Sequence, residues 1–142
     1  LALIQGALFM VLAPLVIEVS PTAVFMTLVI LGLVAFGLTA LGYVIAWSLD
    51  STQGFHAIMN VVLLPMWLLS GAVFPQTGAS GWIQVIMFLN PMTYGVSAIR
   101  GVLAGGNNLG FSTSVWSSLI LIMIFGIVTL AASTASVYSR RA

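Results

Sequence analysis

The sequence predicts an all-α membrane protein with four transmembrane helices and a re-entrant helical hairpin before the last one, in a single transmembrane domain over residues 1–142. Of the 142 residues, 61% are hydrophobic and only 4% are charged, whereas a soluble domain carries about 25% charged residues. The apolar stretches between the charges exceed the ~20 residues that a helix needs to cross a bilayer. Prolines and glycines interrupt residues 61–100 more often than a simple spanning helix requires.

The first predicted span covers about residues 1–17, near the short limit for crossing a bilayer. The chain begins inside this apolar run, so we expect it to be a C-terminal fragment of a longer membrane protein. The second span, at about residues 22–49, reaches roughly 40 Å at ~1.5 Å per residue. Its small residues share one helix face, which either packs closely on a neighbouring helix or only reflects how common such residues are in membranes; these residues are Ala35, Thr39, Gly42 and Ala46.

The third predicted span covers about residues 55–74 and follows a polar run that must lie at a membrane surface. Pro65 removes one intrahelical hydrogen bond and should kink the helix. Asp50, in the polar run, either contacts a cytoplasmic partner or only caps its helix end. At the far end of the span, a Ser-Gly pair and a proline either form a hinge for gating or simply end the span and shape a turn; they are Ser70, Gly71 and Pro75.

Two short apolar segments occupy residues 82–103 and are separated by Asn90 and Pro91. The first would be a helix of about 12 Å, which is too short to cross a bilayer. Trp82 and Tyr94 are residue types that favour the depth of the lipid headgroups. We therefore expect these segments to form a re-entrant or interfacial hairpin.

The last predicted span covers about residues 115–137 and is followed by Arg140 and Arg141. By the positive-inside rule, these arginines place the C-terminus in the cytoplasm, and counting back through four crossings places the hairpin outside. Arg100 then lies on the outer side. An arginine near lipid costs ~3 kcal/mol or more unless it pairs, snorkels or faces water. Arg100 therefore either binds an anionic substrate or lipid headgroup, or snorkels outward and fixes the depth of the hairpin.

The composition argues against several classes of site. The chain has no cysteine, one histidine and two carboxylates, so a metal site or an acid–base pair would lack partners. We expect that histidine, His56, to be an interfacial residue at a helix start. No GxxxxGK[ST] loop for nucleotide phosphates is present, and the scattered charges offer no basic face for nucleic acid. We therefore expect neither an enzyme nor a nucleic-acid-binding protein, and no cofactor on this chain.

The order of these motifs resembles the C-terminal half of an ABC-2 type permease, the membrane subunit of ABC exporters of drugs, polysaccharides and lipid-linked glycans. The resemblance rests on Pro65 followed by LLSGAVFP at residues 68–75, a segment led by Trp82, and NPMTYGVSAIRGVL at residues 90–103. It implies that the four spans are the last four of six and that residues 82–103 are the outer hairpin of the family. Many members have a proline shortly before the tryptophan, where this chain has Gly-Ala-Ser-Gly.

The resemblance implies a permease of the cell membrane, inner or plasma, that pairs with a second permease copy around a central pathway. A separate ABC ATPase subunit would bind ATP and Mg²⁺ and drive transport, and membrane lipid would surround the spans. We predict that the kinked third span and the hairpin form the outer gate. Asp50 is the candidate contact with a cytoplasmic partner, and the candidate gate residues are Pro65, Ser70, Gly71, Phe74, Pro75, Trp82, Asn90, Pro91, Tyr94 and Arg100.

Two other functions remain open. A secondary transporter or channel also uses broken helices, but such proteins usually bury charge near the bilayer midplane. Here all five charged residues fall at span ends or in the hairpin. A membrane scaffold subunit that transports nothing would leave the hairpin unexplained.

Overall fold

The computed structural model describes residues 1–74, 78–105 and 114–139, and every regular element within these ranges is a helix. The prediction of an all-α membrane protein is thus confirmed. In chain order the elements are α1 (Ala2–Leu12), the 3-10 turn η1 (Ala13–Leu15), α2 (Pro21–Trp47), α3 (Thr52–Trp67), the π-helical η2 (Leu68–Ala72), α4 (Gly81–Leu89), α5 (Pro91–Leu103) and α6 (Val115–Ser139).

Three of the described helices are long and apolar enough to cross a membrane, and they lie where the sequence predicts the second, third and fourth spans. They are Pro21–Trp47, Thr52–Ala72 and Val115–Tyr138. The first helix, Ala2–Leu15, is apolar but shorter and covers about 20 Å at ~1.5 Å per residue. The hydrocarbon core of a bilayer is about 30 Å thick, so α1 with η1 is shorter than a full crossing.

Serine side chains cap the N-termini of α2 and α3. Ser20 precedes α2, and its hydroxyl accepts a hydrogen bond from the Ala23 amide at 3.2 Å. Ser51 precedes α3 and accepts from the Gly54 amide at 3.3 Å. Each cap satisfies an amide that has no partner within its helix. The cap of α3 is therefore Ser51, and Asp50 is the exposed residue before it.

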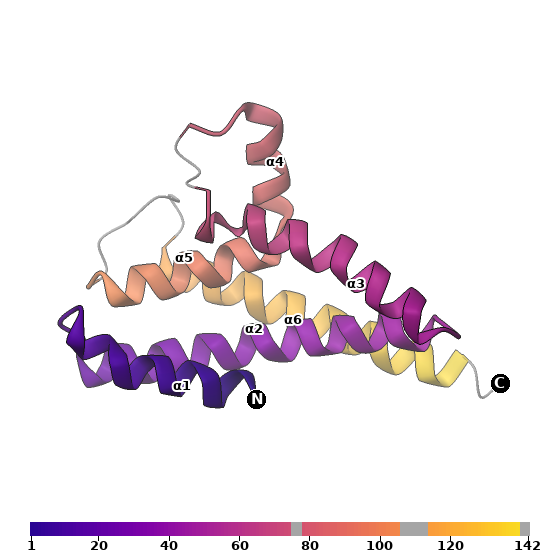
Figure 1. The fold of residues 1–142 in the computed structure, drawn as a ribbon, viewed down its shortest axis with the longest axis horizontal. Helices are drawn as coiled ribbons and strands as arrows, with labels where there is room; N and C mark the ends of the chain where they lie inside the picture. Colours follow the sequence, from indigo (N-terminus) through magenta and orange to yellow (C-terminus); the bar gives the residue numbers. More distant parts are fainter. Residues whose placement is uncertain (75–77, 106–113, 140–142) are drawn as a thin grey trace.

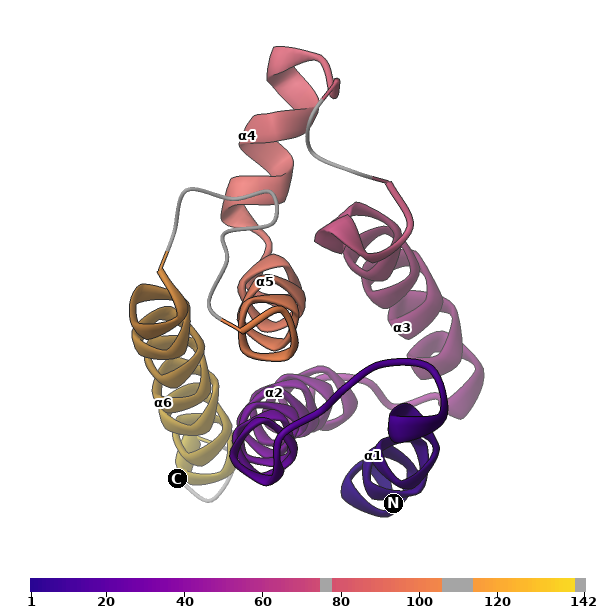
Figure 2. The same ribbon diagram turned by 90° about the vertical axis from the view of Figure 1, so that its left-hand side faces the viewer.

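The core lies where α2, α5 and α6 meet. Figure 2 shows α5 above α2 and beside α6. The buried cluster contains one residue of α2, two of α5 and one of α6: Ile30, Tyr94, Ala98 and Ile122. Glycine permits the closest approaches, because a Cβ at Gly37 would come within 2.8 Å of the Phe125 ring, and one at Gly95 within 2.7 Å of Val34.

The face of α2 that packs differs from the predicted one. Of the four small residues expected to share a packing face, only Gly42 is buried, and Thr39 is exposed, with its hydroxyl donating to the Ala35 carbonyl of its own helix at 2.7 Å. The contact with α6 is instead made at Gly37, because the Phe125 ring leaves no room for a larger residue there. The buried residues of α2 are Thr27, Ile30, Gly37, Ala40 and Gly42.

The two short helices α4 and α5 have different surroundings. In Figure 1, α2 and α6 run along the long axis and α5 lies along the same direction, whereas α4 stands across it. Figure 2 shows α4 projecting away from the bundle of α2, α5 and α6. The two helices join at Asn90, so the segment predicted to be a hairpin is a bent pair of helices. Within this pair α5 contributes Tyr94 and Ala98 to the core cluster, whereas α4 buries a single residue, Met87.

Candidate functional site

The candidate site is built around the interruption of the third predicted span. Pro65 lies inside α3 and brings no amide hydrogen to the helix. The helix then widens into the π-helical η2, and Gly71 leaves helical geometry with a φ of 84°. This left-handed conformation is readily adopted only by glycine. The break therefore lies at the Ser-Gly pair where the sequence predicts it, and π-helical segments of this kind often occur at functional sites.

Ser70 stabilises the interruption from within. Its side chain is buried, its hydroxyl donates to the Trp67 carbonyl at 2.6 Å, and the same oxygen accepts from the Ala72 amide at 3.3 Å. One hydroxyl thereby bonds to backbone groups on both sides of the turn. Backbone groups at membrane depth need such partners because no water is available to replace them.

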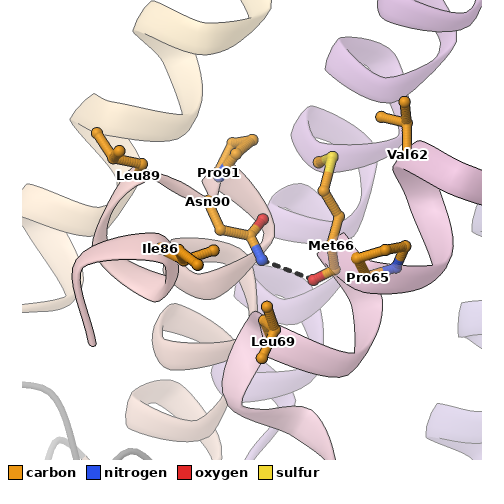
Figure 3. A pocket seen from close by; sticks show the side chains of 8 residues that line it. All are labelled: Val62, Pro65, Met66, Leu69, Ile86, Leu89, Asn90 and Pro91. Carbon is orange, nitrogen blue, oxygen red and sulfur yellow. Dashed lines mark hydrogen bonds between the residues drawn. The ribbon is translucent and has the colours of Figure 1, made fainter. Parts of the chain in front are cut away.

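Asn90 connects the interrupted helix with α5. It is 6% exposed, and its Nδ2 donates to the Met66 carbonyl at 2.6 Å, across 24 positions in the sequence. Its Oδ1 accepts from the Met92 amide at 3.0 Å and so caps α5, with Pro91 in the first turn. Figure 3 shows the amide of Asn90 directed at Met66. One side chain thus starts α5 and fastens it to α3.

Two further side chains of α5 bond to the same stretch of backbone. The hydroxyl of Thr93, which is fully buried, donates to the Leu69 carbonyl at 3.4 Å. Nη2 of the exposed Arg100 donates to the Ala72 carbonyl at 3.3 Å. Both acceptors belong to the last turn of the broken helix, where carbonyls lack intrahelical partners. We call the contacts from Asn90, Thr93 and Arg100 the α3–α5 bonds, and from here on the end of α3 includes η2, which continues it.

Tyr94 holds the bend between the two short helices. Its side chain is buried, and its hydroxyl donates to the Phe88 carbonyl near the end of α4 at 2.6 Å. The rings of Phe88 and Tyr94 also meet edge to face, with centroids 6.3 Å apart. The C-terminal end of α4 is therefore bonded to α5, and Tyr94 belongs to the core rather than to an exposed surface.

An open apolar pocket of about 260 Å³ separates the C-terminal part of α3 and η2 from the C-terminal part of α4. Its lining residues, drawn in Figure 3, are Val62, Pro65, Met66, Leu69, Ile86, Leu89, Asn90 and Pro91. The amide of Asn90 is the polar side-chain group there, and both of its ends already make the hydrogen bonds described above. The pocket therefore offers an apolar surface.

The remaining candidate residues lie away from this cluster or outside the described residues. Phe74 follows η2 and is 55% exposed. Trp82 lies in the first turn of α4 and is 69% exposed. Pro75, between them, lies outside the described residues, as do Arg140 and Arg141, on which the orientation depends. Asp50 lies in the connection between α2 and α3, remote in sequence from the α3–α5 bonds.

The sequence reasoning missed Thr93. Thr93 lies within the Asn-Pro motif, but the motif by itself assigns it no role. The available signal was its position three residues after Asn90, which places both side chains on the same face of a helix. It also missed two buried hydroxyls that have no hydrogen-bond partner in the part of the chain that the structure describes, those of Thr27 and Ser118.

The fold and the site define a multi-pass membrane protein in which one spanning helix is interrupted and braced by a short helix that follows it. Comparison with known protein families then identifies the family of this chain. The model of the ABC-2 type transporter family matches residues 1–104, which include α1 to α5. The chain belongs to the ABC-2 type transporter family.

The comparisons also include a curated relative. It is described as "Putative transport permease ycf38" from Cyanophora paradoxa and is 32% identical over 81 residues. The match covers 51% of this chain and 28% of that protein, so the chain spans less than a third of the relative's length. No solved structure matches the chain significantly.

Proposed function

We propose that this chain belongs to the membrane-spanning permease subunit of an ATP-driven ABC-2 type exporter. The observation that carries the proposal is the family match over residues 1–104, which ends just beyond α5 and so contains the interrupted helix and its brace. A relative described as a transport permease supports the same function. This chain would line part of the translocation pathway, and a separate ATPase subunit would bind and hydrolyse ATP.

The proposed assembly contains two permease copies and two ABC ATPase subunits in the cell membrane, with the permease C-terminus in the cytoplasm. ATP and Mg²⁺ would be held by the ATPase subunits, because this chain has no phosphate-binding loop. Asp50, exposed in the connection between α2 and α3, is the proposed contact with a cytoplasmic partner. Binding of ATP can shift the permease between conformations only if the complex holds ATP more tightly in one of them.

The proposed outer gate consists of the end of α3 and the beginning of α4. Phe74 and Trp82 lie on either side of the connection between these elements, and both residues are exposed. The left-handed turn at Gly71 and the open pocket beside Pro65 both lie at this end of α3. The gate would open and close as α4 moves relative to α3.

Co-purification tests the proposed function. The full-length permease and an ATPase encoded beside it are expressed together and purified in lipid nanodiscs, and ATP hydrolysis is measured with and without the permease. We expect a complex of two permeases and two ATPases in which the permease changes the rate of hydrolysis. Failure of every candidate ATPase to associate would instead favour a secondary transporter, a channel or a membrane scaffold.

A further inference from the structure

The C-terminal end of α3 has two very different contacts. Toward α5 it receives the α3–α5 bonds, and the donors at Asn90 and Thr93 are buried. Toward α4 it borders the open apolar pocket. Within the described residues, no side-chain hydrogen bond joins α3 or η2 to α4, although Tyr94 ties the far end of α4 to α5.

We infer that Asn90 and Thr93 are positioning residues that keep the end of α3 and α5 together as one unit during transport, while α4 turns about its junction at Asn90. This inference rests on the proposed function and specifies which surfaces of the gate separate. The opening lies between α3 and α4, on the side of Phe74 and Trp82, and not between α3 and α5.

The cost of separating polar groups away from water supports this division. Pulling α3 from α5 would leave the two buried donors of Asn90 and Thr93 without the Met66 and Leu69 carbonyls that accept their hydrogen bonds. At membrane depth no water is available to replace the lost hydrogen bonds. Moving α4 away from α3 would uncover a lining that is apolar apart from Asn90, and within the described residues it would break no side-chain hydrogen bond between the two elements. The contact between α3 and α4 is therefore the one that opens at lower cost.

The first measurement asks whether Thr93 fastens α3. Hydrogen exchange is followed by mass spectrometry in the full-length permease in nanodiscs, for peptides covering residues 66–74. Thr93→Val removes the hydroxyl at nearly constant volume and should accelerate exchange roughly three- to sixteen-fold, the range expected for loss of an interhelical hydrogen bond in a membrane protein. Thr93→Ser should restore slow exchange.

Thr39→Val is the matched control, because the Thr39 hydroxyl bonds within its own helix and is exposed. It should leave exchange in residues 66–74 unchanged. The role given to Thr93 would be overturned if Thr93→Val exchanged residues 66–74 at the wild-type rate. It would also be overturned if Thr93→Val and Thr39→Val accelerated this exchange equally.

The second measurement asks whether the unit persists during the cycle. The wild-type complex with its ATPase is compared without nucleotide and after trapping with ATP and vanadate. We expect exchange in residues 66–74 to stay the same and exchange in residues 81–89 to change. Acceleration in residues 66–74 to the level of Thr93→Val would overturn the inference. If no ATPase associates, the proposed function fails together with the cycle that depends on it, and the first measurement still decides whether Thr93 fastens α3.

Discussion

Replacing Asn90 removes two hydrogen bonds of different kinds, and two substitutions can separate them. Asn90→Ala removes both the 2.6 Å bond to the Met66 carbonyl and the 3.0 Å cap bond from the Met92 amide. Serine caps a helix about as well as asparagine but is too short to reach α3. Asn90→Ser should therefore remove only the interhelical bond.

The expected magnitudes follow from these two terms. Interhelical hydrogen bonds in membrane proteins contribute about 0.6 kcal/mol on average and about 1.7 kcal/mol at most. The bond from Asn90 is short and buried, which places it toward the upper end, at about 1 kcal/mol. Loss of a helix cap costs about 1 kcal/mol. Asn90→Ser should thus lower the free energy of unfolding by about 1 kcal/mol, and Asn90→Ala by about 2 kcal/mol.

Equilibrium unfolding of the full-length permease in mixed micelles measures both values, with tryptophan fluorescence as the signal, since Trp67 and Trp82 lie on α3 and α4. Gln84→Ala is the matched control, because this exposed amide bonds to the nearby Ala79 carbonyl, and it should change stability by less than about 0.5 kcal/mol. An Asn90→Ala variant as stable as the control would refute the claim that Asn90 stabilises the contact between α3 and α5. Equal losses for serine and alanine would refute the separation into two bonds.

Three further substitutions test the fold around the site by the same unfolding measurement. Gly71→Ala should cost about 1–2 kcal/mol, because alanine is strained at a φ of 84°, whereas Gly81→Ala, which meets open space, should be close to neutral. Gly37→Ala should cost about 1–3 kcal/mol by forcing a methyl group to within 2.8 Å of an aromatic ring on α6; Gly32→Ala, with 3.5 Å of room, is its control and should cost less. Tyr94→Phe should cost about 1 kcal/mol through loss of the 2.6 Å bond to a carbonyl at the end of α4. An outcome in which either glycine pair shows no difference would contradict the geometry described for that pair.

Much of the fold follows from patterns that act locally. Apolar runs of sufficient length predict the spans, and the residues that disrupt regular helices predict where they are interrupted. The turn at Gly71 and the start of α5 at Asn90 both lie where the sequence places them. These features depend on one residue and its immediate neighbours in the chain, so the sequence alone contains the information.

The contacts between helices could not be predicted in the same way. The expected face of α2 was defined by small residues alone, but a packing face also depends on the bulky side chains of its neighbours, here Phe125 against Gly37. The bond from Thr93 to Leu69 joins residues 24 positions apart, and its existence depends on how α5 lies against η2. Neither the length nor the polarity of a segment specifies that arrangement.

A disulfide across the proposed gate tests the account most directly. The chain contains no cysteine of its own, so cysteines introduced together at Phe74 and Trp82 can be oxidised selectively if the remainder of the permease is also free of cysteine. We expect the oxidised permease to lose its effect on ATP hydrolysis by the partner subunits and the reduced permease to regain it, while either single cysteine has no effect. Hydrolysis and transport that continue unchanged in the fully cross-linked complex would contradict a gate between α3 and α4.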